Sequence, residues 1–121
     1  MQFNQRAFAP ASSGMAEAGY LYVPQPCAAA GARCKVHVAI HGCVQAAESV
    51  GDKFYTESGY NHWADDNKLI VLYPQVNKST VPYNPQGCWD WWGYTGANYA
   101  LKSGVQMKAI KAMVDRLTQT P

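Results

Sequence analysis

The chain has 121 residues, of which 15% are charged, and its formal net charge at neutral pH is +2. This length suits one domain with a real core and is too short for two. The few, scattered basic residues argue against nucleic acid or an anionic membrane as a partner, and no apolar run approaches the ~20 residues of a membrane helix. Because charged residues fall below the roughly 25% of an ordinary soluble domain, some apolar surface is expected to need a partner.

The N-terminal third of the chain is predicted to hold two strands. Residues 1–14 are polar, with proline and serine, and are predicted to form an irregular arm, so that residues 15–121 make up the domain itself. Residues 19–24 are predicted to be a short strand that ends at Pro24. Residues 35–40 are predicted to be a central strand, because Val36, Val38 and Ile40 are β-branched.

The middle of the chain predicts a βαβ unit. One helical turn is expected around residues 46–50, and a short helix over residues 59–67, with Ser58 as its N-cap and Asn67 as its C-terminal cap. Residues 69–73 form a continuous apolar run, which is typical of a parallel strand buried on both faces. The two long strands should therefore be parallel and joined by a right-handed crossover.

The last third is predicted to be a long loop followed by a helix. Residues 75–95 contain an aromatic cluster, and a loop of this length in a compact domain is usually functional. Ser103 and Gln106 are expected to form a capping box for a helix that runs to about residue 117. The predicted fold class is α/β, with a short, mostly parallel sheet. Three strands leave a long edge bare, which indicates that the fold is incomplete in this chain.

The four cysteines are an even number, which favours disulfides and an oxidising compartment. They allow three connectivities. Cys27 and Cys34 flank a loop between two predicted strands, and a bridge between them would leave Cys43 to pair with Cys88. A zinc site is disfavoured, because the chain has no Cys-x-x-Cys pair and the histidine spacing is wrong, and no metal or other cofactor is expected. The first residues carry no signal-peptide pattern, so an extracellular or periplasmic location implies a start inside a longer exported protein.

Candidates for a catalytic nucleophile are weak. A serine esterase carries Gly-x-Ser-x-Gly on a strand-to-helix turn, and the nearest stretch here surrounds Ser49, with no strand leading into it. Ser103 is better explained as a helix cap, and Asp90 favours a hydrogen bond within its loop over a triad role. The thiol of Cys43 is a further candidate, against which a disulfide to Cys88 is favoured.

The turn His41-Gly42-Cys43 leaves the central strand at its carboxyl end, where ligands bind in α/β folds. Gly42 allows a tight turn that would aim the Cys43 backbone N–H at a developing oxyanion. A tight turn with a purely structural cystine is an equally open alternative. His41 is expected to hold the turn by a hydrogen bond, and with Trp89 it is assigned to the substrate-binding site, where an apolar wall suits an ester chain. Trp92 is expected in the core.

Four segments together resemble extracellular poly(3-hydroxybutyrate) depolymerases and related polyester or feruloyl esterases. These segments are residues 41–45 (HGCVQ), 59–65 (GYNHWAD), 69–75 (LIVLYPQ) and 84–91 (NPQGCWDW). The resemblance implies a three-layer α/β-hydrolase domain with a Ser-His-Asp triad. It also implies that Cys43 supplies an oxyanion-hole N–H and that Trp89 lines the polymer-binding crevice.

Some members of this family are circularly permuted, and the chain looks like the C-terminal part of such a member. It departs from the family pattern because it has no Gly-x-Ser-x-Gly and no recognisable triad His or Asp. The resemblance therefore implies a polyester substrate, no activity on esters by this chain alone, and the missing part of the catalytic domain as a partner. The alternatives are a non-catalytic, disulfide-stapled polymer-binding module and a subunit completed by another chain.

Overall fold

The computed structural model describes residues 1–29 and 31–119. At the centre of this part of the chain lies a four-stranded mixed sheet with the strand order β1-β2-β4-β3. The elements are β1 (Gln2–Asn4), β2 (Ala18–Tyr22), β3 (Lys35–Val38), β4 (Leu69–Tyr73), α1 (Ala47–Val50), α2 (Lys53–Glu57), α3 (Tyr60–Asn67) and α4 (Val105–Thr118), with 3-10 helices at Gln5–Ala7, Ala11–Ser13 and Gln25–Cys27.

The predicted βαβ unit is present. β3 and β4 pair in parallel, in a register that runs from Lys35 opposite Leu69 to Val38 opposite Leu72. The prediction of a mostly parallel sheet is wrong, however, because β1 pairs with β2 and β2 pairs with β4 in the antiparallel sense. Short 3-10 turns, without a crossover helix, return the chain from β1 to β2 along the same edge, and such a connection gives antiparallel neighbours.

The N-terminal residues, expected to be an irregular arm, belong to the sheet. The side chain of Gln5 is fully buried, and its Nε2 donates to the carbonyl oxygens of Ala16 at 2.7 Å and Gln75 at 3.0 Å. Its Oε1 accepts the backbone N–H of Gln75. A Cβ at Gly19 would lie 2.7 Å from both Gln5 Oε1 and the Phe3 ring, so glycine allows β1 and the Gln5 amide to approach β2. These long-range bonds tie the first residues to the end of β4.

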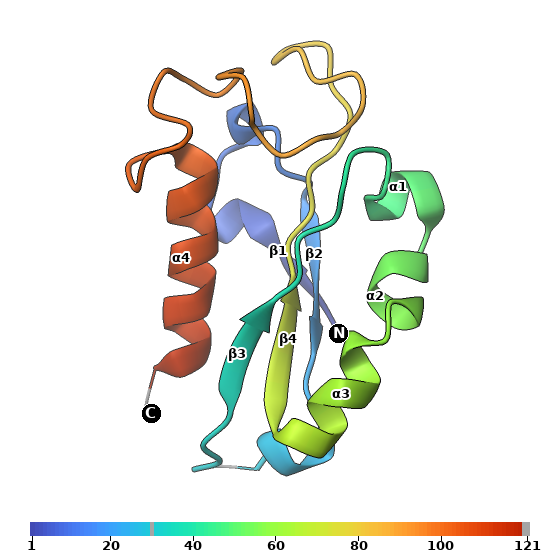
Figure 1. Cartoon of the computed structure of the whole chain (residues 1–121). Helices are drawn as coiled ribbons and strands as arrows, with labels where there is room; N and C mark the ends of the chain where they lie inside the picture. The colour runs from blue at the N-terminus through green and yellow to red at the C-terminus, as the bar shows by residue number, and fades with distance from the viewer. Residues whose placement is uncertain (30, 120–121) are drawn as a thin grey trace.

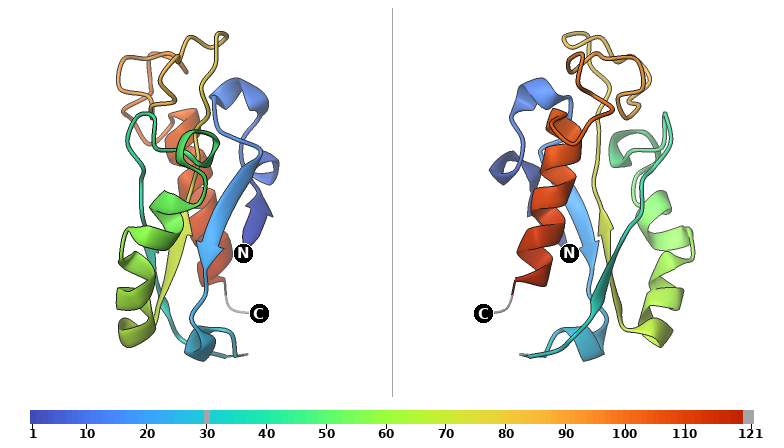
Figure 2. Two further views of the ribbon diagram at one scale, coloured as in Figure 1. Left: turned by 90° about the vertical axis from the view of Figure 1, so that its right-hand side faces the viewer. Right: turned by 60° about the vertical axis from the view of Figure 1, so that its left-hand side comes forward.

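Helices cover both faces of the sheet. In Figure 1 and in the right-hand view of Figure 2, α4 lies on one side and α1, α2 and α3 on the other. β4 divides its buried side chains between these faces. Leu72 packs in one core cluster with Met113 of α4, while Val71 and Tyr73 pack in a second cluster with Ala64 of α3. The apolar run of β4 is thus buried on both faces, as its composition predicts.

The predicted helix ends are partly wrong. α4 begins after Gly104, with no side-chain cap, and α3 begins after Gly59 rather than after Ser58. The expected capping box fails because Gln106 is buried and its Nε2 donates to Ser13 O at 2.9 Å and to the Tyr94 hydroxyl at 2.8 Å. A long-range polar contact therefore replaces the local one.

Two connecting segments meet at one end of the sheet. The segment after β3 and the long segment between β4 and α4 both emerge at the carboxyl ends of β3 and β4 (Figure 1). Within the described residues, no helix has the length and apolar character needed to cross a membrane.

Candidate functional site

The candidate site is built around His41, the first residue of the turn that follows β3. Its side chain is buried, with 2% of its surface exposed. The ring Nε2 accepts the backbone N–H of Val76 at 3.1 Å, and Nδ1 lies 2.7 Å from the carbonyl oxygen of Gly42. Because Nε2 is an acceptor, the proton of the neutral ring is on Nδ1, which donates to Gly42. The expected turn-holding hydrogen bond is therefore present, and neither ring nitrogen is left free for a substrate atom.

Burial also sets the protonation state of this imidazole. Burial lowers the pKa of His41 below its ordinary value, and the hydrogen bond to the Gly42 carbonyl opposes that shift. A charged ring would carry a proton on Nε2, facing the N–H of Val76. The neutral form is thus favoured by burial and by the hydrogen bond from Val76, and the bond to Gly42 places its proton on Nδ1.

Three backbone N–H groups of the turn have acceptors. Gly42 N–H donates to Gln45 Oε1 at 2.6 Å, Val44 N–H to Gln86 O at 2.7 Å and Gln45 N–H to Gly42 O at 3.2 Å. Within the described part of the chain, Cys43 N–H has no acceptor, and Cys43 is exposed. The His41 N–H likewise has no acceptor there, but His41 is buried, so Cys43 carries the unpaired donor on the exposed part of the turn.

The direction of that donor follows from the peptide that joins Gly42 to Cys43. Its carbonyl oxygen is held by the ring of His41 and by the N–H of Gln45. In a trans peptide the N–H points opposite to the C=O. The Cys43 N–H therefore points away from the buried imidazole.

A disulfide and a strained residue hold the turn against the long loop. Cys43 is bridged to Cys88, with a Cα–Cα distance of 4.3 Å, and Cys27 is bridged to Cys34, which confirms the favoured pairing. Val44 has φ = 59°, a left-handed conformation that is rare for a β-branched residue. Such strain is typical of functional sites. Here the flanking disulfide and the bond from Val44 N–H to Gln86 hold it.

Asn84 fixes the far end of this disulfide, and sequence reasoning missed it. Asn84 is fully buried, its Oδ1 accepts the N–H of Cys88 at 2.9 Å, and its Nδ2 donates to Cys88 O at 2.9 Å. The hydroxyl of Tyr94 donates to the same carbonyl oxygen at 2.6 Å. Asn84 directly precedes Pro85, and an Asn at such a position is the sequence signal for a turn-holding side chain.

Trp89 lies next to the turn, as expected. Its ring centroid is 5.6 Å from that of His41 at an angle of 43°. It is partly buried and packs against the core cluster on the α4 side of the sheet. The indole Nε1 is buried and has no hydrogen-bond partner among the described residues.

Asp90 organises the loop that follows, which agrees with the loop role favoured for it over a triad role. Its carboxylate accepts five hydrogen bonds, from the N–H groups of Trp92, Gly93, Tyr94 and Thr95 and from the Thr95 hydroxyl. Burial raises the pKa of Asp90, but the bonds from Thr95, Gly93 and Trp92 outweigh it, and the pKa is lowered overall. The carboxylate is thus a structural anion.

The remaining aromatic residues of the loop lie at the surface. Trp92 is 40% exposed and Trp91 69% exposed, so the expectation of Trp92 in the core is wrong. The two rings pack against each other, at a centroid distance of 5.2 Å, instead of against the sheet. The chain turns after Asp90, so the side chains of Trp91 and Trp92 both lie at the surface.

The structure adds no nucleophile to the site. Ser49 lies in the one-turn helix α1, and the described residues give its hydroxyl neither a histidine nor an acid as a hydrogen-bond partner. His62 is exposed on α3, and His37 packs beside Tyr60, at 5.1 Å between ring centroids. Within residues 1–29 and 31–119, no group of three or more His, Cys, Asp or Glu side chains is placed to hold a metal ion.

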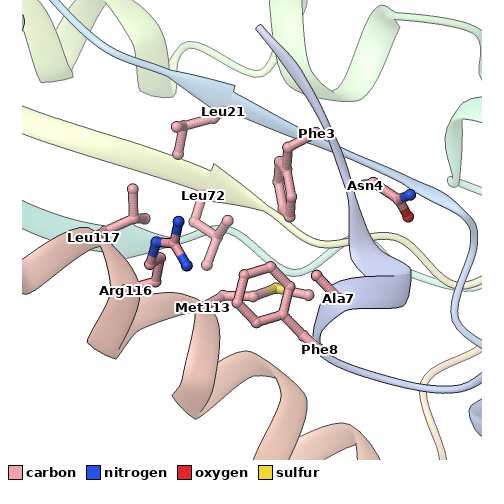
Figure 3. A pocket seen from close by; sticks show the side chains of 9 residues that line it. All are labelled: Phe3, Asn4, Ala7, Phe8, Leu21, Leu72, Met113, Arg116 and Leu117. Carbon is pink, nitrogen blue, oxygen red and sulfur yellow. The ribbon is translucent and has the colours of Figure 1, made fainter.

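A separate apolar cavity of about 270 Å³ lies between β1, β2 and α4 (Figure 3). Met113 and the rings of Phe3 and Phe8 project into it, with the guanidinium of Arg116 near its rim. None of its lining residues belongs to the turn or to the 86–90 segment. The cavity is therefore distinct from the candidate site.

Residues 18–119 match the family model described as Esterase PHB depolymerase. The chain is a member of the PHB depolymerase esterase family. It is 52% identical over 119 residues to a poly(3-hydroxybutyrate) depolymerase from Delftia acidovorans, and this match covers 98% of the chain and 23% of the relative. A polyhydroxybutyrate depolymerase from Talaromyces funiculosus is 45% identical over 115 residues, which cover 88% of the chain and 34% of the relative.

Solved structures give the same result. The crystal structure of PHB depolymerase from Penicillium funiculosum superimposes with a TM-score of 0.84 at 43% identity, over 95% of this family member and 39% of that chain. A serine-to-alanine PHB depolymerase variant in complex with an R3HB trimer gives a TM-score of 0.85 at 43% identity, over 96% and 39% of the two chains. The chain thus spans about a quarter to two-fifths of the length of these PHB depolymerases.

Proposed function

We propose that the chain forms part of the catalytic domain of a serine esterase that hydrolyses poly(3-hydroxybutyrate) or a related polyester. In this proposal Cys43 N–H stabilises the oxyanion, and Trp89 lines the crevice that receives the polymer. The observation that carries it is the unpaired N–H of the exposed Cys43, in a turn where the N–H groups of Gly42, Val44 and Gln45 are paired. Family membership supplies the reaction class.

The chemistry requires such a donor. Attack of a serine on an ester carbonyl turns the carbonyl oxygen into an oxyanion, which backbone N–H groups stabilise at about 2.7–3.1 Å. The tetrahedral intermediate then collapses to an acyl-enzyme, which water hydrolyses. The sequence has no Gly-x-Ser-x-Gly, so the nucleophile of the proposed site lies outside it. No cofactor enters this mechanism.

His41 is a positioning residue in this proposal, in place of a direct substrate contact. Its ring connects Val76 N–H to the carbonyl of Gly42 and so sets the direction of Cys43 N–H. The Cys43–Cys88 bridge holds the same turn against the segment that carries Trp89. A donor fixed before the reaction needs no reorganisation when charge develops, which is the source of its catalytic value.

The three-layer α/β-hydrolase architecture is part of the same proposal. Helices on both faces of the sheet, and a turn at the carboxyl end of the parallel strand β3, support it. The partner that completes the domain is the segment that carries the triad. Two disulfides favour an oxidising compartment, so we place the protein outside the cytoplasm.

The relatives and the apolar wall beside the turn support the proposed substrate class. The matched proteins are named as depolymerases of poly(3-hydroxybutyrate), and one solved relative carries an R3HB trimer. Trp89 places an indole ring beside the oxyanion turn, and apolar walls suit a methyl-bearing polyester backbone.

The test is a chimaera in which the full 121-residue chain replaces the matched segment of the Delftia acidovorans depolymerase. This chimaera should hydrolyse p-nitrophenyl butyrate and 3-hydroxybutyrate oligomers, while the chain alone should not. A folded chimaera without hydrolysis would contradict the proposal. Turnover by the chain alone, abolished by Ser49→Ala, would contradict the assignment of the nucleophile to another segment.

A second candidate function is a non-catalytic polymer-binding module. The exposed rings of Trp91 and Trp92, at one end of the sheet, favour it. Granules of polyhydroxybutyrate should then retain the isolated chain, and Trp91→Ala/Trp92→Ala should release it, with Trp63→Ala, an exposed tryptophan on α3, as the matched control. Absence of binding would exclude this alternative. Activity that appears only on mixing with a separate triad-bearing chain would identify a split enzyme.

A further inference from the structure

We infer that Gln45 is a positioning residue for hydrolysis, because its side chain locks the turn that presents the Cys43 N–H. The inference rests on the proposed function and adds to it a residue outside the reacting atoms. Gln45 is assigned no contact with a substrate atom. It acts through Gly42.

Gln45 binds Gly42 from two sides. Its side-chain Oε1 accepts the Gly42 N–H at 2.6 Å, and its backbone N–H donates to Gly42 O at 3.2 Å. The peptide before Gly42 is therefore fixed by its N–H, and the peptide after it by its C=O. The second of these peptides carries the Cys43 N–H, so both contacts act on the orientation of that donor.

The packing at Gly42 shows that this side-chain contact is built into the turn. A Cβ at Gly42 would lie 2.8 Å from Gln45 Oε1 and 3.2 Å from its Cδ. The amide of Gln45 thus occupies the space that any other residue at position 42 would need. A larger residue at position 42 would therefore displace the end of the exposed Gln45 side chain from its contact with the Gly42 N–H.

The turn needs this contact because the rest of it is exposed. Gly42, Cys43, Val44 and Gln45 are all exposed, and of residues 41–45 His41 alone is buried. Gly42 also has the widest backbone freedom of any residue. Without the Gln45 carbonyl, its N–H turns to water and the His41–Gly42 peptide gains freedom. The Cys43 N–H then loses one of the contacts that fix its direction, although the core stays intact.

The first test is amide hydrogen exchange measured by NMR on the full chain. Gln45→Leu keeps the size of the side chain and removes the acceptor, while Gln45→Glu keeps an acceptor oxygen. Gln86→Leu is the matched control, because Gln86 is exposed and its side chain makes no hydrogen bond within the described residues. The amide proton of Gly42 should exchange about five to ten times faster in Gln45→Leu than in the parent chain, as expected for one lost hydrogen bond. Its exchange rate should be close to that of the parent in Gln45→Glu and in Gln86→Leu. Unchanged exchange of Gly42 in Gln45→Leu would overturn the inference.

The second test measures hydrolysis in the chimaera described above. Gln45→Leu should lower kcat about tenfold with KM changed by less than about twofold, because orientation of the donor matters in the transition state. Gln45→Glu should restore most of kcat. Gly42→Ala, which displaces the Gln45 amide, should lower kcat to a similar extent, and Gly42→Ala/Gln45→Leu should be little worse than either change alone.

These outcomes separate the inference from the proposed function. An active chimaera in which Gln45→Leu leaves kcat unchanged would overturn the inference and leave the proposed function standing. Fully additive effects of the Gly42 and Gln45 changes would also overturn it, since the two residues would then act independently. A folded chimaera without any hydrolysis would contradict the proposed function, and the inference would fall with it.

Discussion

His41 Nε2 accepts the backbone N–H of Val76 across 3.1 Å, although the two residues are 35 positions apart. Val76 follows β4 and His41 follows β3, so this bond joins the carboxyl ends of the two parallel strands. It also fixes the tautomer in which Nδ1 donates to the carbonyl of Gly42. The geometry of the proposed oxyanion turn therefore depends on a neutral imidazole.

The neutral imidazole predicts a pH dependence of stability. Burial lowers the pKa of folded His41 below its ordinary value of 6.5. As the pH falls through the ordinary value, the unfolded chain takes up a proton before the folded chain does, so the free energy of unfolding decreases. It should be constant at higher pH with respect to this residue, and decrease as the pH falls below about 6.5. Denaturation in urea across this range measures it.

Two variants identify the residue responsible. The exposed His62 on α3 serves as the control, and His62→Gln should keep the pH dependence. His41→Asn should be less stable at neutral pH and should show a weaker decrease toward pH 5. The same decrease in His41→Asn as in the parent would contradict this assignment.

Asp90 predicts a second, local effect on stability. Asp90→Asn removes the charge and part of the acceptor capacity that hold Trp92, Gly93, Tyr94 and Thr95. We expect a loss of about 1–2 kcal/mol in the free energy of unfolding, since the carboxylate is partly exposed to water. The contribution should be complete above the unfolded-state pKa of 3.8 and should fade as the pH falls through the lower folded-state pKa. Asp66→Asn, on the exposed side of α3, should have little effect; equal losses would contradict the role of Asp90.

The two disulfides should contribute unequally to stability. The Cys43–Cys88 bridge closes a loop with a sequence separation of 45, and the Cys27–Cys34 bridge one of 7. Loop-closure entropy predicts a loss of about 4 kcal/mol for the first pair and about 2.4 kcal/mol for the second when both cysteines are replaced by alanine. Chemical denaturation of the two double variants compares these values directly. A larger loss for the Cys27–Cys34 pair would show that loop entropy does not dominate.

The local pattern of the sequence predicts β2, β3 and β4, but not β1; β3, predicted as a central strand, lies at an edge of the sheet. The run Leu69–Tyr73 is apolar throughout, and the structure buries it between two core clusters. β1 has the sequence Gln-Phe-Asn, with one apolar residue, and no periodicity marks it. Its place is determined by the buried amide of Gln5, whose partners lie 11 and 70 residues away. Contacts of this range leave no local trace in the chain.

The candidate site shows the same division. The turn at Gly42 and the pairing of the cysteines follow from residue type and spacing. The contact between His41 and Val76, and the side chain of Gln106 that displaces the predicted capping box, depend on tertiary approach. The free N–H of Cys43 emerges only when the donors of Gly42, Val44 and Gln45 have been assigned partners.

Two substitutions of Trp89 should differ in their effect on the free energy of unfolding. Its indole N–H is buried without an acceptor in the described part of the chain. Trp89→Phe removes this donor and keeps most of the ring contacts, so the free energy of unfolding should stay within about 1 kcal/mol of the parent or rise. Trp89→Ala should lose about 3 kcal/mol, because the ring packs against the core cluster. Thermal denaturation of both variants measures these changes in stability. A loss of stability for Trp89→Phe as large as that for Trp89→Ala would show that the indole N–H is satisfied by a partner.

One pair of variants shows whether the Cys43 backbone N–H stabilises the oxyanion. In the chimaera, Cys43→Ala/Cys88→Ala removes the disulfide and keeps the N–H, whereas Cys43→Pro/Cys88→Ala removes both. The ratio of their kcat values on p-nitrophenyl butyrate isolates the donor. We predict that the proline variant is slower by at least about 10²-fold, with both proteins folded by circular dichroism. Equal kcat values would contradict the account.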